Sequence, residues 1–237
     1  MSKQKTKIQK NFQLVKLIFP IFISNWIRKV TTAFVTPIRF SINSGHFKSS
    51  LSQKALDKNG QPLPWYSYPA IEFLKTKNFS NKTVLEFGSG QSTLWWAKVS
   101  KSVKSFEKDE TWYKNIKENI PNNVQVIHLQ EETEIEILNT IEQILKLENK
   151  KYDVIIIDGL FRKQLCKTAM LYLKEFGIII TDNSEGYGFK EAFDGTGFKR
   201  VDFHGFSPGV VLKQATSFFF KDQSFIFEND SEIKLDY

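Results

Sequence analysis

The chain has 237 residues, of which 41% are hydrophobic and 22 are Phe, so it is long enough for one α/β domain with a buried core and an appendage. Its net charge of +7 is uneven, because the first 56 residues hold ten Lys or Arg and no acid, whereas the other 181 hold 23 basic and 26 acidic residues. A nucleic-acid-binding domain carries its basic residues on the folded body, so this distribution disfavours a nucleic-acid partner.

The single cysteine, Cys166, excludes an intramolecular disulfide framework and is typical of a reducing compartment. We therefore expect a cytoplasmic protein. Cys166 falls in an apolar helical stretch, which favours packing in the core over reactivity.

The N-terminal segment contains a short apolar run, Leu17–Ile23, which Pro20 interrupts. This run is well short of the roughly 20 apolar residues that a bilayer crossing needs, and no small-residue cleavage site follows it as in a signal peptide. With Pro20 in the first turn of a helix, one apolar stripe forms from Phe19, Phe22, Ile23, Trp26 and Val30. Such a helix can lie in an anionic membrane surface, which makes peripheral membrane contact one interpretation. A helix docked on the protein's own domain and a partly disordered basic tail are the alternatives.

We divide the chain into a basic N-terminal segment and linker, residues 1–56, and a folded domain, residues 57–237. Residues 41–59 are polar and read as a turn-rich entry to that domain. After them the spacing of apolar residues alternates between the period of a helix and the period of a strand. They predict helices at 68–77, 92–99, 110–119, 133–147, 162–172 and 187–194, and strands at 83–87, 103–107, 124–128, 152–157, 177–181, 200–203, 215–220 and 224–227.

Two of these strands, Val154–Ile157 and Ile178–Ile180, are apolar without alternation, as expected of parallel strands covered on both faces. The prediction is an open, doubly wound α/β sheet, in which ligands bind beyond the carboxyl ends of the strands. The polar residues at those ends are Glu86, Glu107, His128, Asp158, Asp182 and Asn183.

A glycine turn, Gly88-Ser89-Gly90, joins the first of these strands to a helix, and Glu107 ends the next strand 19 residues after Gly88. This spacing is typical of a nucleoside-cofactor site, where the glycines allow close approach and the acid takes the two ribose hydroxyls. Thr93 stands where a dinucleotide fingerprint has a third glycine. Glu86, just before the turn, would repel a pyrophosphate and favour a sulfonium, so the charge favours S-adenosylmethionine over a nicotinamide dinucleotide.

The segment Glu86–Ser92 resembles the first motif of class I S-adenosylmethionine-dependent methyltransferases, with Ser92 in place of the last glycine. The resemblance spans residues 66–220 and implies a Rossmann-like seven-stranded sheet whose last strand, residues 215–220, is antiparallel. It also implies adenine contacts near residues 128–130. The cofactor-binding residues are then expected to be Glu86, Gly88, Ser89, Gly90, Ser92, Glu107 and Asp158.

The acceptor is expected at the rim of the sheet, where Asp158 and the pair Asp182-Asn183 follow neighbouring strands. These three residues resemble the Mg²⁺ site of catechol-type O-methyltransferases, although the basic residue after the first acid comes only at Arg162. A site without metal is the alternative. Candidate catalytic residues are Asp158 and His204, since either can accept a proton.

The candidate substrate-binding residues are Tyr66, Tyr68, Arg162 and Asn183. The segment Trp65–Pro69 is expected to form an aromatic lid or to pack in the core. Segments around Asp158 and in 205–209 also resemble bacterial methyltransferase-like proteins of unassigned substrate. We expect a methyltransferase that acts on an oxygen, in preference to a nitrogen, of a small-molecule or glycan-linked acceptor. A catalytically silent, cofactor-binding scaffold at the membrane surface and a nicotinamide-dependent reductase are the alternatives.

Overall fold

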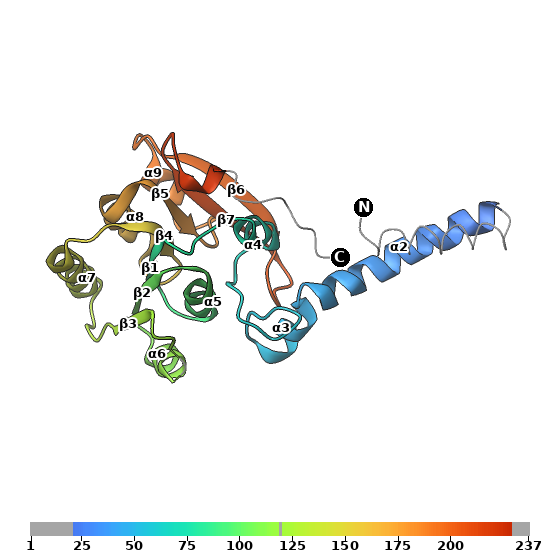
Figure 1. Ribbon diagram of the computed structural model, residues 1–237, viewed down its shortest axis with the longest axis horizontal. Coiled ribbons are helices and arrows are strands. Elements are labelled where there is room, and N and C mark those ends of the chain that lie inside the picture. Colours follow the sequence, from blue (N-terminus) through green and yellow to red (C-terminus); the bar gives the residue numbers. More distant parts are fainter. Residues whose placement is uncertain (1–20, 119, 229–237) are drawn as a thin grey trace.

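The computed structural model describes residues 21–118 and 120–228, and within them a seven-stranded sheet has the order β3-β2-β1-β4-β5-β7-β6 (Figure 1). Strands β1 to β5 pair in parallel, and β7 runs antiparallel to both β5 and β6. This confirms the predicted fold class and its antiparallel strand. The strands are β1 (Thr83–Phe87), β2 (Ser102–Glu107), β3 (Val124–His128), β4 (Tyr152–Ile157), β5 (Leu173–Thr181), β6 (Lys199–Phe206) and β7 (Lys213–Phe220).

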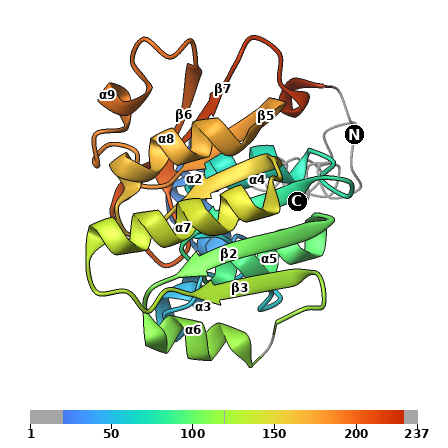
Figure 2. The same ribbon diagram turned by 90° about the vertical axis from the view of Figure 1, so that its left-hand side faces the viewer.

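Helices cover both faces of the sheet, and Figure 2 shows α7 and α8 in front of the strands with α4 and α5 behind them. Another helix of this domain, α6, packs against β2 and β3 at one edge of the sheet. Their bounds are α4 (Tyr68–Lys75), α5 (Gln91–Val99), α6 (Glu110–Lys117), α7 (Glu134–Glu148), α8 (Arg162–Tyr172) and α9 (Phe189–Phe193).

The central strands bury both of their faces, which explains why their apolar runs do not alternate. In β4, Val154 and Ile156 join the core beneath α4 and α5, while Ile155 and Ile157 join the core beneath α7 and α8. Full burial of one such side chain stabilises the fold by about 1.5–3 kcal/mol. Cys166 of α8 is 1% exposed in the second core, as its apolar surroundings predicted.

Two helices precede the sheet domain, α2 (Ile21–Asn43) and α3 (His46–Ser52). In Figure 1, α2 runs away from the sheet, and near its C-terminal end Phe40 packs edge-on against Tyr68 of α4 at 5.3 Å. The turn-rich entry predicted for residues 41–59 is therefore wrong in part, because α3 lies within it. The Ser49 hydroxyl donates to the Leu56 carbonyl at 2.9 Å, so a contact outside the helix stabilises this short polar element. Among the described residues, no helix is long and apolar enough to cross a membrane.

Several predicted boundaries differ from the observed ones. Strands β5, β6 and β7 are all longer than predicted, because pairing with neighbours extends them past their apolar residues. The predicted strand at 224–227 is instead a 3₁₀ turn (Phe225–Phe227), in which Phe225 is buried edge-on against Phe79 at 5.9 Å. Phe19 of the predicted stripe, Pro20 of the predicted first turn, and Asn119 at a predicted helix end lie outside the described residues.

Candidate functional site

A cavity of about 770 Å³ opens where the carboxyl ends of β1, β2 and β4 meet. This volume is within the range of small-molecule sites, about 300–1,000 Å³. The glycine turn after β1 forms one wall, Glu107 and Asp158 form two polar corners, and Leu129, Ile137 and other apolar side chains complete it. The cavity therefore lies at the edge where ligands bind in open α/β sheets.

The two glycines of the turn lack a side chain for different structural reasons. Gly88 has φ +108°, and a Cβ there would lie 2.6 Å from the Asp158 carbonyl oxygen, so no side chain fits. Gly90 has an extended backbone that any residue adopts, and a Cβ there would meet no atom within 4 Å. Because Gly90 also lines the cavity, its missing side chain leaves space for a ligand to approach the backbone.

Glu86 is fully buried and lies behind the cavity wall, which corrects the expectation that its carboxylate faces the ligand. Its two oxygens accept hydrogen bonds from the hydroxyls of Ser92 and Thr93, both at 2.5 Å. Burial raises the pKa of Glu86 to about 8, while these two hydrogen bonds oppose the shift. A carboxyl that keeps its proton near neutral pH does not repel a pyrophosphate, so the charge argument must rest on other residues.

Glu107 lies on the cavity wall at the end of β2, where the sequence predicted the ribose-binding acid. One of its oxygens accepts from both the backbone N–H and the hydroxyl of Ser89, each at 2.7 Å, and the other accepts from the Asp109 N–H at 2.8 Å. A carboxylate has about four acceptor positions, so Glu107 keeps capacity for a ligand hydroxyl. The Ser89 hydroxyl can also rotate away and release a further position.

Arg162, the first residue of α8, holds the opposite corner of the cavity. Its guanidinium pairs with Asp158 at 3.0 Å and donates to the carbonyls of Gly159 at 3.0 Å and Asp182 at 2.7 Å. It also donates to the Asn183 amide oxygen at 3.2 Å and lies 4.4 Å from the centre of the Tyr187 ring. One cation thus organises the carboxyl ends of β4 and β5.

Asp158 is the titrating group of this corner, and its side chain is 22% exposed. Burial raises its pKa to about 6, the Arg162 cation lowers it, and the Glu107 charge raises it. At neutral pH the group is mainly ionised and can accept a proton.

The residues predicted to bind Mg²⁺ do not fit a metal. Arg162 already contacts both Asp158 and Asn183 with its positive charge. Asp182 is 3% exposed, and its oxygens accept from the Thr216 hydroxyl at 2.8 Å and from the Gln214 amide. Burial raises the pKa of Asp182 well above its usual range, which further disfavours a charged metal ligand. Within 21–118 and 120–228, no cluster of three or more His, Cys, Asp or Glu residues could hold a metal ion.

The structure does not bring the other predicted rim residues to the cavity wall. Tyr66 is fully buried, and its hydroxyl accepts from the Trp96 indole at 3.3 Å. Tyr68 packs against Phe40 of α2, and His204 is exposed on the edge strand β6. None of the three lines the cavity.

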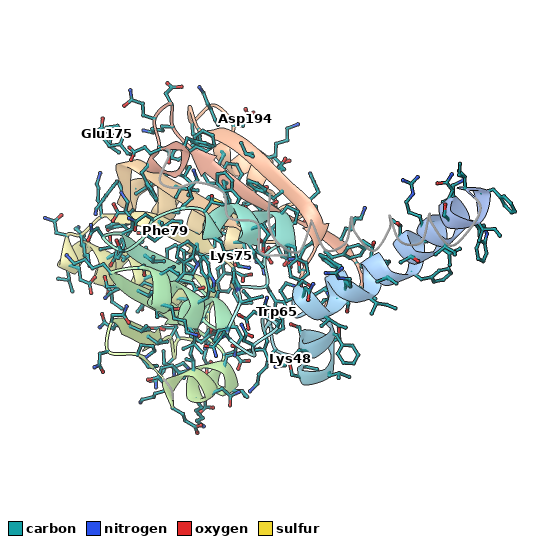
Figure 3. The ribbon with its side chains drawn as sticks, turned by 45° about the vertical axis from the view of Figure 1, so that its right-hand side comes forward. Lys48, Trp65, Lys75, Phe79, Glu175 and Asp194 are labelled. Carbon is teal, nitrogen blue, oxygen red and sulfur yellow. The ribbon has the colours of Figure 1, made fainter. Side chains whose placement is uncertain are left out.

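Trp65, in the segment expected to form a lid, does line the cavity. Figure 3 shows Trp65 next to α3, and its ring lies 6.2 Å from that of Trp112 in an edge-on arrangement. Leu129 also lines the cavity and lies in 128–130, where the resemblance implied adenine contacts. Sequence reasoning missed Trp112 and Tyr187, because each comes from a different segment and belongs to no local motif. The i, i+4 pair Ile137 and Ile141 on α7 was visible in the sequence, but it is as typical of core packing as of a ligand wall.

Comparisons with known proteins find similar folds among solved structures only. No model of a protein family matches the sequence, and no curated protein matches it. Among solved structures, the chain is similar to a precorrin-6y C5,15-methyltransferase from Geobacter metallireducens, with TM-score 0.51 and 12% identity over 73% of this chain and 96% of the other. It is also similar to cofactor-bound Rv0187 from MTB, with TM-score 0.50 and 15% identity over 80% and 97%.

A protein from Streptococcus mutans has TM-score 0.47 and 15% identity over 62% of this chain, and the chain spans 46% of that protein's length. The sheet order and the two stronger likenesses together show the fold of the class I S-adenosylmethionine-dependent methyltransferases. A dinucleotide-binding Rossmann sheet has the order 3-2-1-4-5-6, without an antiparallel strand inserted beside the fifth.

The protonation of Glu86 should make stability depend on pH. Its pKa is about 8 in the folded chain, against about 4.3 for an unperturbed Glu, so over this interval the unfolded state releases a proton that the folded state keeps. The free energy of unfolding should therefore fall as pH rises, by at most about 1.4 kcal/mol per pH unit. Glu86→Gln retains partners for both hydroxyls and should lack this decline. Urea unfolding of both proteins at a series of pH values measures it, and parallel pH curves would contradict it.

Since Arg162 supplies the positive charge at this corner, wild-type protein should give no saturable heat with Mg²⁺ or Mn²⁺ in isothermal titration. The same titration of Asp182→Ala provides the comparison and should also give no saturable heat. A heat present in the wild type and lost in that variant would restore the metal site.

Proposed function

We propose that this protein is an S-adenosylmethionine-dependent methyltransferase that acts on an oxygen, in preference to a nitrogen, of a small-molecule or glycan-linked acceptor. The observation that carries this proposal is the shared cavity of Gly90, Glu107 and Asp158 at the carboxyl ends of three parallel strands. The fold supports it as well, since its strand order is that of class I methyltransferases.

The residues present fit this cofactor. Glu107 has acceptor capacity for ribose hydroxyls, Gly90 leaves its backbone open, and Leu129 and Ile137 offer apolar contacts for a base. Acidic residues outnumber basic ones on the cavity wall, which favours a cationic ligand over a pyrophosphate. The acidic residues are Glu107, Asp109, Glu110 and Asp158, and the basic ones are Lys108 and Arg162. When bound, S-adenosylmethionine supplies a methyl group activated on a sulfonium.

The acceptor side requires a group that positions the acceptor and a base that takes its proton. Asp158 serves as the base in this proposal, because it is the carboxylate at the Arg162 corner that faces the cavity. Arg162 fixes the position of Asp158 and keeps it ionised. The exposed side chains Leu160 and Tyr187 line the same region and suit contact with a sugar ring or another flat acceptor. His204 remains a predicted catalytic residue without a contact to this cavity.

The two glycines provide a matched test of cofactor binding. Gly90→Ala adds a methyl group where a Cβ meets no protein atom, so it should keep the thermal midpoint of unfolding and weaken S-adenosylmethionine binding about tenfold or more. Gly88→Ala should instead destabilise the fold by about 1–3 kcal/mol, because its φ is positive and its Cβ meets backbone.

Gly186→Ala, whose Cβ would be 3.8 Å from the nearest atom, is the control with unchanged binding. Isothermal titration measures the affinity of all three variants for S-adenosylmethionine, and thermal unfolding measures their stability. Unchanged affinity in Gly90→Ala, or wild-type binding of reduced nicotinamide dinucleotide in its place, would refute the cofactor assignment.

The base assignment predicts a pH profile. Transfer of labelled methyl groups into an extract of the source cells should decline below about pH 6 as Asp158 gains a proton. Arg162→Gln removes the cation that lowers this pKa, so the decline should begin at a higher pH. Asp158→Asn should lose about 10²-fold or more in rate while still binding the cofactor. An acid limb that does not move in Arg162→Gln would exclude Asp158 as the base.

A further inference from the structure

The helix α2 presents an apolar face that the described sheet domain does not cover. Phe22, Trp26, Phe34 and Ile38 are each between 59% and 73% exposed, and we call them the apolar face of α2. At about 100° per residue they fall within an arc of about 160° on the helix. Figure 1 shows why they stay exposed, since α2 runs away from the sheet. Large side chains exposed in this way mark an interaction surface.

The basic residues of α2 lie outside this apolar face, and the helix has no acid. The exposed Ile21, Val35 and Ile42 lie outside it as well. Arg28, Lys29 and Arg39 lie within about 100° of one another, centred opposite the apolar face. The first acidic residue of the whole chain is Asp57. An aromatic and aliphatic face backed by Lys and Arg is the composition of helices that lie in the interface of anionic membranes, where long basic side chains reach the headgroups.

A second copy of this chain fits the same face less well. Two α2 helices paired through their apolar faces would leave the basic side chains of both copies on the outside, and α2 offers no carboxylate to neutralise them. An anionic lipid surface satisfies the apolar face and the charges at once, because headgroup phosphates neutralise the cations while the acyl boundary takes Trp26 and its neighbours.

The surface next to α2 is also apolar, and it reaches the cavity. Phe47 and Leu51 of α3 are exposed, as are Val211 and Leu212 of the β6–β7 loop (residues 207–212). This loop packs on α3, where the Gly209 N–H donates to the His46 ring at 3.3 Å.

The same loop contacts the cavity wall. The Pro208 carbonyl accepts from the Trp65 indole at 2.9 Å, and Trp65 lines the cavity.

We propose that the apolar face of α2 binds the surface of an anionic lipid bilayer, and that α3 and the β6–β7 loop hold the mouth of the cavity beside that surface. The proposal concerns binding alone and does not depend on the methyltransferase activity.

The test is co-sedimentation of the full chain with vesicles of phosphatidylcholine, alone or mixed with phosphatidylglycerol. We expect binding to the mixed vesicles that weakens in high salt. The double variant Trp26→Ser/Phe34→Ser should reduce this partitioning about tenfold or more, because it removes the apolar contact. The matched control is Ile135→Ser/Leu147→Ser, which changes two residues of α7 that are 71% and 86% exposed on another face, and it should partition as the wild type does.

Equal far-ultraviolet circular dichroism and equal thermal midpoints verify that each variant is folded. Val211→Ser/Leu212→Ser tests the second half of the proposal and should weaken binding, since this loop lies between α3 and the cavity.

Three results would overturn the proposal. The first is a wild type that does not bind mixed vesicles, and the second is an α7 control that loses as much binding as the α2 variant. The third is a dimer, seen by light scattering, that the α2 variant converts to a monomer when no vesicle binding is observed. The last result would assign the apolar face to a second copy of the chain.

Discussion

The buried carboxyl of Glu86 is the interaction on which the geometry of the cavity depends. It lies one residue before the end of β1 and accepts hydrogen bonds from the Ser92 and Thr93 hydroxyls in the first turn of α5. The Thr93 oxygen in turn accepts from the Gly90 N–H at 3.0 Å. Strand, turn and helix are thereby joined through one side chain, and the backbone of Gly90 is fixed where a ligand can approach it. A buried carboxyl without these partners would cost several kcal/mol. The acid that a sequence motif presents as a ligand contact therefore acts on the protein, by holding the turn that contacts the ligand.

Arg162 has the corresponding role at the other end of the cavity, where the ends of β4 and β5 leave two carboxylates and several carbonyl oxygens close together. A divalent metal and a guanidinium are two solutions to the same excess of oxygen atoms. The guanidinium provides several donors in a fixed plane, so it satisfies carbonyls as well as a carboxylate. It leaves Asp158 partly exposed and with a pKa of about 6, as the proposed role of Asp158 as a base requires.

The sequence predicted the parts of the structure that are local. Apolar runs and a short turn motif depend on neighbouring residues, so the carboxyl ends of β1 to β5 fall where the sequence predicted them, and Gly88, Gly90 and Glu107 line the cavity at that edge. The rest depends on contacts between distant segments. The helix α3 forms in a serine-rich stretch because Leu56 and the β6–β7 loop pack against it. The role of Glu86 could not be foreseen, since only the fold shows that two hydroxyls of the next helix cover it. The metal prediction was drawn from a resemblance in the order of Asp158, Asp182 and Asn183, and the contacts of the Arg162 side chain decide against it.

The antiparallel strand connects the appendage to the cavity. In an all-parallel sheet every connection after a strand returns to the opposite edge through a helix. Here β6 runs parallel to β5, and β7 returns directly beside it, so the loop between them lies at the carboxyl edge together with the cavity. That loop is what α3 packs against and what accepts the Trp65 hydrogen bond. The strand that distinguishes this fold from a dinucleotide-binding sheet therefore also places α3 beside the Trp65 wall of the cavity. A surface bound by α2, as proposed above, would then lie next to the cavity and not next to the amino-terminal edge of the sheet.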